Sequence, residues 1–273
     1  MLTSLRRGFN IYGTIAAMVP KLYLAYSIWV WMELLVQIIA VVIKVAFWRA
    51  VFASSPSGMV GGLGLDQTLN YIILAQIFLP ALHASSTIYY FGSLMRQGQV
   101  GIELLRPVDF QLAVYVRNVT EVLVGLITQI PLAVIAWFIF PFELPSNPLL
   151  WLAFCVTLFL GNAVLFFFDW ILACISFYST ETWGLSVLRF GISNFLSGSL
   201  IPLAIMPLWL QQVAGALPFS YALYVPVSLI SGITPLDAVL RIWLLELAYL
   251  AILIPLSRLI FKVAVRKVTV QGG

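Results

Sequence analysis

Residues 94–121 read LMRQGQVGIELLRPVDFQLAVYVRNVTE and form a long polar island between strongly apolar stretches. Pro107 disfavours the α conformation at Arg106, so a short helix is expected to end there. Asp109 follows at the position where the N-cap of a new helix is needed, and that helix runs towards Phe140. The island therefore predicts a short helix, a break, a cap and then a long helix.

The rest of the chain is far more apolar than a soluble protein. Of its 273 residues, 62% are hydrophobic and 9% are charged, and its mean hydropathy is +1.06. Soluble domains carry about 25% charged residues, so the composition predicts an all-α integral membrane protein with residues 1–273 in a single domain. The net charge of +4 does not indicate nucleic-acid binding, because the basic residues gather at the ends of apolar stretches, where anionic lipid attracts them.

Six apolar stretches reach the length of about 20 residues that a helix needs to cross a bilayer core. With the N-terminus placed inside, most basic residues fall on the cytoplasmic side, so both termini are expected there. Residues 94–107 then face the cytosol. The six predicted transmembrane helices are 24–48, 68–90, 119–140, 149–171, 183–203 and 238–261.

Residues 1–23 predict an amphipathic helix lying in the cytoplasmic interface. Apolar side chains recur at three- and four-residue spacing and form one stripe, opposite Arg6, Asn10 and Lys21. A basic pair followed by an apolar run can also indicate a cleaved secretory signal. Asn10 and Gly13 interrupt the run, which favours the interfacial helix.

Residues 197–237 are apolar but are interrupted repeatedly by proline and glycine. Irregular backbone is tolerated at membrane depth where protein or a water-filled cavity covers it. We therefore expect short re-entrant helices that enter the outer leaflet and turn back before the last span. Their breaks would form a gate on the outer side, at Gly198, Pro202, Pro207 and Pro218.

Charged side chains inside the apolar stretches cost about 2.5–3.5 kcal/mol each at the bilayer centre. Glu33 lies well inside the first stretch, and Arg189 is its candidate partner unless Glu33 is uncharged. Asp169 and Glu246 raise the same question nearer the membrane faces. These four residues predict a translocation path or a subunit contact, and the alternative is a set of buried structural pairs. Lys44, about 16 Å beyond Glu33 along the helix, is expected to extend its ammonium group outward to the interface.

The motifs of common enzymes are missing from this sequence. It has no Gly-x4-Gly-Lys-Ser/Thr phosphate loop and no Gly-x-Ser-x-Gly elbow, and its one histidine, His83, rules out His-rich metal sites. We expect no catalytic residue, no metal site and no cofactor in this chain.

Two separated blocks resemble a known family. Arg96-x-Gly98 followed by Leu104-Leu105-Arg106-Pro107 is similar to the cytoplasmic motif of a bacterial subfamily of ABC-2-type transporter permeases. A second Pro- and Gly-punctuated block agrees with that family in order and position. It comprises Ser197-Gly198, Ile201-Pro202-Leu203, Met206-Pro207-Leu208-Trp209-Leu210, Leu217-Pro218-Phe219, Val225-Pro226 and Ser231-Gly232.

The resemblance implies a permease subunit of an ATP-driven exporter in the bacterial inner membrane. Its implied partners are separate ATPase subunits, which carry the ATP and Mg²⁺, and a second permease that makes a homodimer or a heterodimer for an amphipathic substrate. The coupling helix that contacts the ATPase would comprise Arg96, Gln97, Gly98, Gly101, Glu103, Arg106 and Pro107.

Two alternatives to this interpretation stay open. The arginines of the polar island could contact lipid headgroups from a solvated loop. The chain could also be a secondary transporter or channel that works without ATP, although the inverted repeats or paired midplane charges typical of that class are not visible.

Overall fold

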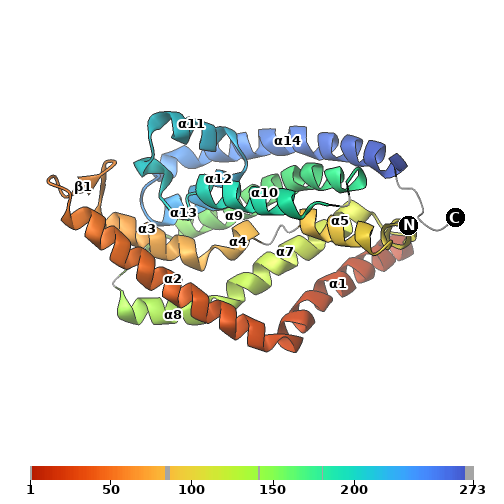
Figure 1. Cartoon of the computed structure of the whole chain (residues 1–273), viewed down its shortest axis with the longest axis horizontal. Helices are drawn as coiled ribbons and strands as arrows, with labels where there is room; N and C mark the ends of the chain where they lie inside the picture. The colour runs from red at the N-terminus through yellow and green to blue at the C-terminus, as the bar shows by residue number, and fades with distance from the viewer. Residues whose placement is uncertain (1, 84–86, 141, 180, 268–273) are drawn as a thin grey trace.

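The structure, a computed structural model, describes residues 2–83, 87–140, 142–179 and 181–267, with the backbone alone for residues 2–10 and 83. The chain is almost entirely helical, and its long helices run along one axis of an elongated molecule (Figure 1). An all-α membrane fold is thereby confirmed. The expected N-terminal helix is α1, Leu2–Ala25, while residue 1 lies outside the described residues.

Within the described residues, four helical segments are long and apolar enough to cross a membrane. They correspond to the first, third, fourth and sixth predicted spans. The segments are Ser27–Ala53, which is α2; Phe110–Ile139, formed by α7 (Phe110–Thr128) and α8 (Ile130–Ile139); Pro148–Phe177, formed by α9 (Pro148–Ala173) and a 3-10 turn (Cys174–Phe177); and Leu236–Lys267, formed by α14 (Val239–Ala264) between 3-10 turns at Leu236–Ala238 and Val265–Lys267.

The second predicted span, 68–90, is not one continuous helix. It is divided into α3 (Leu65–Ile77), α4 (Pro80–His83) and α5 (Thr87–Arg96). Pro80 lacks an N–H group and its ring clashes with the preceding turn, so the hydrogen-bond ladder of α3 ends before it. These three helices succeed one another along the long axis in Figure 1.

The fifth predicted span, 183–203, is also shorter than expected. Its helix, α10, covers Trp183–Leu196, and 14 residues extend only about 21 Å. The chain turns at Gly198, whose φ of +78° places it in the left-handed region that ends helices.

Short helices occupy the following stretch, as expected. They are a 3-10 turn at Leu203–Ile205, α11 (Leu208–Ala216), α12 (Phe219–Ala222) and α13 (Tyr224–Ile230). Pro202, Pro207 and Pro218 each stand directly before one of the first three, where a missing N–H group costs nothing. Against α9 the packing of α12 is close, since a Cβ atom on Gly161 would lie 1.9 Å from the Tyr221 carbonyl oxygen.

A small β-hairpin joins α2 to α3, between the first two predicted spans. Its strands, β1 (Met59–Val60) and β2 (Leu63–Gly64), are antiparallel. Gly61 and Gly62 form the turn with φ of +58° and +82°, as a type I′ hairpin turn requires.

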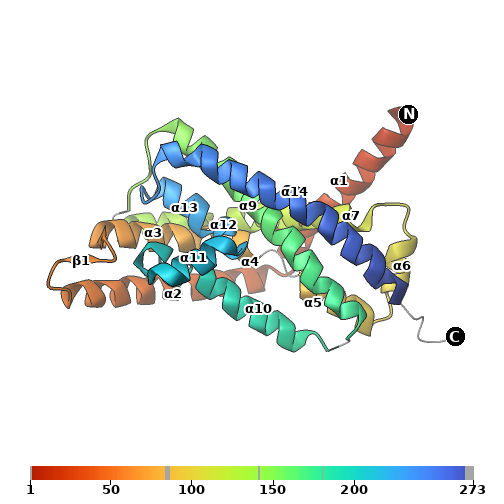
Figure 2. The ribbon, with the colours of Figure 1, turned by 90° about the horizontal axis from the view of Figure 1, so that it is seen from above.

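Different elements lie at the two ends of the molecule. The short helix α6 (Val100–Leu105), the start of α1 and the end of α14 lie towards one end of the long axis (Figure 2). The hairpin lies at the opposite end, and the short helices α11 to α13 lie on that side of the middle. The short helix α6 is thus separated from the proline-rich stretch by much of the length of the molecule.

Candidate functional site

The polar island folds into α6 and the two sharp turns that flank it. At the end of α5, the Gly98 amide donates to the Met95 carbonyl at 3.1 Å and the Gln99 amide donates to the Leu94 carbonyl at 2.9 Å. These two bonds make a Schellman motif, with Gly98 in the left-handed conformation at φ +66°. Glycine therefore sets the direction in which α6 leaves α5.

One side of α6 is anchored in the protein and the other is exposed. Val100 is buried and belongs to a hydrophobic cluster with Phe91 and Trp170. Ile102 and Leu105 are 63% and 86% exposed, and their three-residue spacing puts them on one face. Apolar side chains presented in this way are typical of a surface that contacts another protein.

Beside this face, Glu103 and Arg106 form an ion pair of 3.0 Å between Oε2 and Nη1. Arg106 has an extended backbone, with φ −64° and ψ 139°. The predicted break before Pro107 is therefore confirmed. Gln97 and Gly101 lie in the turn and in the helix, respectively, and Arg96 is the last residue of α5.

Asp109 connects three helices at the end of this element. Its Oδ1 atom accepts a hydrogen bond of 2.7 Å from the Leu112 amide, which makes it the N-cap of α7, as predicted. Its other oxygen accepts from Arg258 of α14, and its own amide donates to the hydroxyl of Tyr12 on α1 at 3.3 Å. Burial alone would raise the pKa of Asp109, but the hydrogen bonds from Arg258 and from the Leu112 amide hold that pKa below its ordinary value.

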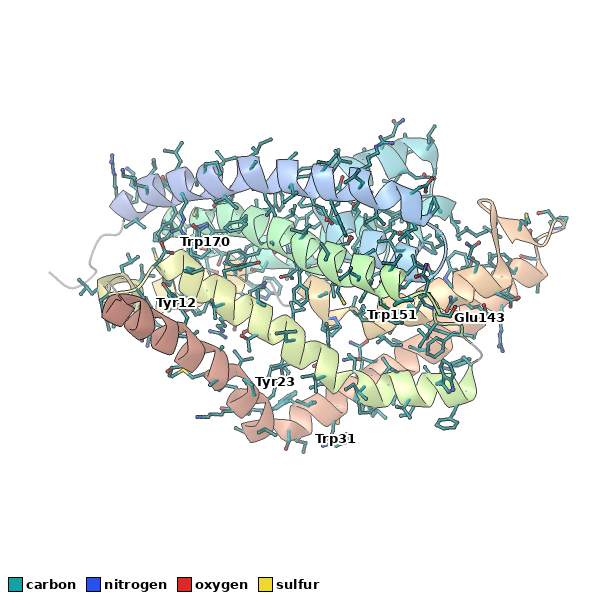
Figure 3. All side chains as sticks on the ribbon, turned by 180° about the vertical axis from the view of Figure 1, so that it is seen from behind. Tyr12, Tyr23, Trp31, Glu143, Trp151 and Trp170 are labelled. Atoms are coloured by element: carbon teal, nitrogen blue, oxygen red, sulfur yellow. The ribbon has the colours of Figure 1, made fainter. Side chains whose placement is uncertain are left out.

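An aromatic cluster surrounds the base of the same element. Its members are Phe91 of α5, Phe110 of α7, Trp170 of α9, Phe177 of the following 3-10 turn and Phe261 of α14. The ring of Phe91 lies 4.8 Å from Trp170 and 5.6 Å from Phe110, and Trp170 lies 5.1 Å from Phe261, between centroids. Trp170 lies towards the same end of the molecule as Tyr12 (Figure 3). The helices that meet here are thus packed together by large rigid side chains.

Arg189 and Asp169 do not belong to this element, and they pair with each other. Both side chains are buried, and the guanidinium donates from two nitrogens to the two carboxylate oxygens, with 2.9 Å between Nε and Oδ1. The pair joins α10 to α9. Arg189 is therefore not the partner of Glu33, whose side chain is exposed on α2.

Glu246 is the remaining charge that the sequence singled out. Its side chain is fully buried in α14, and among the described residues neither carboxylate oxygen has a hydrogen-bond partner. A buried unpaired carboxylate is costly and is normally neutralised by a proton. No described group of three His, Cys, Asp or Glu side chains gathers as a metal site would require.

Lys44 does not extend to the interface, contrary to the expectation from its position. Its ammonium group donates to the Gln76 side chain at 2.7 Å and to the Ser199 carbonyl at 2.8 Å. Next to this carbonyl, the Tyr71 hydroxyl donates to the Gly198 carbonyl at 2.9 Å. The prediction failed because these acceptors become available only when α3 and the turn at Gly198 pack beside α2.

These contacts place the expected outer stretch against α2 and α3. A Cβ atom on Gly198 would lie 2.6 Å from the Tyr71 hydroxyl, so the close approach requires glycine. Sequence reasoning singled out Gly198 and named Lys44 with the wrong environment, but it missed Tyr71 and Gln76, for which the only local signal was a polar group inside an apolar stretch.

Comparison with known proteins yields one match. A family model described as ABC-2 family transporter protein matches residues 38–272, which include α6 and the whole proline-rich stretch. No curated protein and no solved structure matches the chain.

Proposed function

We propose, because the chain belongs to the ABC-2 family of transporter proteins, that it is the transmembrane permease subunit of an ATP-driven exporter. The observation that carries the proposal is α6, a short helix that exposes Ile102 and Leu105 next to the Glu103–Arg106 ion pair. We propose that a separate ATPase subunit docks on this face from the cytosol. The chain itself carries no phosphate-loop motif, so ATP and Mg²⁺ would be held by that partner.

Force applied to α6 has a short route into the membrane helices. Arg106 and Pro107 connect it directly to Asp109, whose contacts reach α1, α7 and α14. The aromatic cluster packs α5 and α9 together with the helices that Asp109 contacts. Closure of the ATPases would therefore tilt several helices together, as rigid-body switching requires.

At the outer side, the same movement would act on the stretch that begins at Gly198. Lys44 holds the Ser199 carbonyl to α2, and Pro202, Pro207 and Pro218 divide the stretch into short pieces. We propose that these pieces close the external end of the path and separate when α2 moves.

A second permease, identical or different, would complete the path for an amphipathic substrate. Glu33 supports such an assembly, because it is exposed on α2 among exposed apolar side chains such as Trp29 and Val36. A carboxylate facing hydrocarbon costs at least about 2.5 kcal/mol. A partner subunit that covers Glu33 would remove that cost. In the orientation that places α6 in the cytosol, both termini would also lie in the cytosol.

The test replaces the ion pair of α6. The double variant Glu103→Gln/Arg106→Gln is expected to insert normally but to lose stimulation of the co-purified ATPase. The matched control is Asp237→Asn/Arg241→Gln, which removes one exposed acid and one exposed base outside α6. Normal ATPase stimulation in the Glu103/Arg106 variant would disprove docking at this site. Transport by the isolated chain in vesicles without nucleotide would instead indicate a secondary transporter or channel.

A further inference from the structure

A cavity of about 240 Å³ lies between α1, α5, α6 and α7, directly beside the Glu103–Arg106 pair. In Figure 3, α1 runs beside α7, and Tyr12 and Tyr23 mark the course of α1. The cavity shares Glu103 and Arg106 with the proposed docking site, but its other lining residues lie outside α6. Its lining combines an aliphatic and a charged surface.

One wall of the cavity is aliphatic. Ile15, Met18 and Leu22 of α1 face Val114 of α7 across it. Met18 and Leu22 are also 56% and 49% exposed, so the side of the cavity at α1 continues into an apolar outer surface. A ligand with a hydrocarbon portion could therefore enter between α1 and the surrounding membrane.

The other wall carries charge. Arg106 and Arg117 line the cavity with Glu103, which gives the lining an excess of one positive charge. Arg117 lies seven residues into α7, so it is about 10 Å deeper along the helix than Phe110. Because Arg106 precedes α7, Arg117 is attached to the backbone at the deeper position along this wall.

Both guanidinium groups are oriented but not saturated by their ion pairs. Arg106 contacts Glu103 through Nη1, and Arg117 contacts Glu121 through Nε at 2.8 Å, while lying over the Tyr90 ring at 5.1 Å from its centroid. A guanidinium has five N–H donors in a fixed plane. Further donors are therefore held in position for the oxygens of an anion, and phosphate is an anion that arginine binds by two parallel hydrogen bonds.

We propose that this cavity binds the phosphate head of an anionic phospholipid from the cytoplasmic leaflet, with the acyl chains lying outside along α1. A volume of 240 Å³ equals that of about eight water molecules. It holds a phosphate group and the start of a chain but excludes a whole lipid. A free phosphate ion would gain nothing from the aliphatic wall, which favours the lipid.

Such a lipid would join α1 to the element that carries α6. The choice of leaflet and the effect on the ATPase rest on the proposed function, whereas binding of the lipid in the cavity does not. The lipid would act as a wedge that fixes the angle between α1 and α7, and so it would set how α6 is presented to the ATPase.

The experiment uses the full chain, purified and delipidated in a neutral detergent. Short-chain phosphatidylglycerol, short-chain phosphatidylcholine and sodium phosphate are titrated separately while thermal unfolding is followed. A ligand that binds only the folded protein raises the unfolding temperature, and above the Kd the rise continues with the logarithm of ligand concentration. We expect this logarithmic stabilisation by phosphatidylglycerol and none by the other two compounds at the same concentrations.

Two variants locate the site. Ala113→Phe fills the cavity without changing a charge, and Arg117→Gln removes the deeper guanidinium. Each is expected to weaken the apparent affinity for phosphatidylglycerol about tenfold, whereas Arg241→Gln, which removes an exposed arginine elsewhere, is expected to leave it unchanged. If Arg117→Gln does not fold, Ala113→Phe decides, since it removes no ion pair.

Each other outcome overturns the proposal. Unchanged affinity in Ala113→Phe would place the lipid elsewhere, and equal stabilisation by sodium phosphate would assign the site to a free anion. Equal stabilisation by phosphatidylcholine would show that charge is not recognised. None of these readouts uses the ATPase, so loss of lipid binding and loss of ATPase docking are measured independently.

Discussion

At Gly98 the backbone is in the left-handed region with φ +66°, and a Cβ atom there would meet nothing within 4 Å. The cost of Gly98→Ala is therefore backbone strain alone, about 1–2 kcal/mol. We expect this variant to lower the free energy of unfolding by that amount and to reduce ATPase stimulation by misdirecting α6. Gly58→Ala is the control, because Gly58 has a similar φ of +65° and open space but lies before the hairpin, far from α6 in the sequence. Equal loss of ATPase stimulation in the two variants would contradict the role assigned to the Gly98 turn.

Asp169 and Arg189 are expected to act mainly on stability. Asp169→Ala leaves the guanidinium of Arg189 buried without its partner, which destabilises proteins by about 3–5 kcal/mol. Glu33→Ala, at an exposed position on α2, is expected to leave unfolding of the single chain almost unchanged. Thermal unfolding and the yield of monodisperse protein measure both effects. Normal folding of Asp169→Ala with impaired transport would indicate that the pair lines the path after all.

The contacts of Asp109 show which residues could be predicted from the sequence. The capping bond to Leu112 spans three residues, and the neighbouring Pro107 already indicated the break. Arg258 and Tyr12 lie 149 and 97 positions away. Only the packing of α1 and α14 beside α7 brings them to Asp109, so no local pattern could identify them.

At the scale of the helix, the exposed face of α6 is the clearest sign of a partner. Leu105→Ser removes a largely exposed apolar side chain, so stability is expected to change by less than about 0.5 kcal/mol. Stimulation of the ATPase is expected to fall at least about tenfold, because truncating an anchor residue of an interface commonly costs more than 1.4 kcal/mol. Met59→Ser, at an exposed position in the hairpin, is the control. Stimulation retained in Leu105→Ser would show that the partner contacts a different face.

Helix boundaries were predictable where a proline or a capping residue marks them in the sequence. Pro107 and Asp109 marked the end of one helix and the start of the next. Pro80 likewise indicates a helix end inside the second predicted span. Because the residues around it are uniformly apolar, one continuous helix was nevertheless expected there. The prediction that Lys44 extends to the interface failed for a different reason. Whether a lysine reaches the interface or an internal acceptor depends on what packs beside its helix.

For the molecule as a whole, the match over residues 38–272 confirms the ABC-2 family that the sequence was expected to belong to. Four apolar helical segments, of the six predicted, were found among the described residues. The two that differ are 68–90, which is broken before Pro80, and 183–203, which is broken at the Gly198 turn that contacts Lys44 and Tyr71. Hydropathy reports how apolar a stretch is, and it does not report whether tertiary contacts replace helical hydrogen bonds.

The proposed orientation places α6 and the hairpin on opposite sides of the membrane. They lie towards opposite ends of the long axis (Figure 2), and Gln97 beside α6 and Ser57 beside the hairpin are both exposed. In a background where Cys155 and Cys174 are replaced by serine, we expect a membrane-impermeant maleimide to label Ser57→Cys in intact cells. We expect it to label Gln97→Cys only after the membrane is opened, because the docking face must reach a cytosolic ATPase. Labelling of Gln97→Cys in intact cells would place α6 outside the cell, beyond the reach of any ATPase, and would disprove the proposed source of energy.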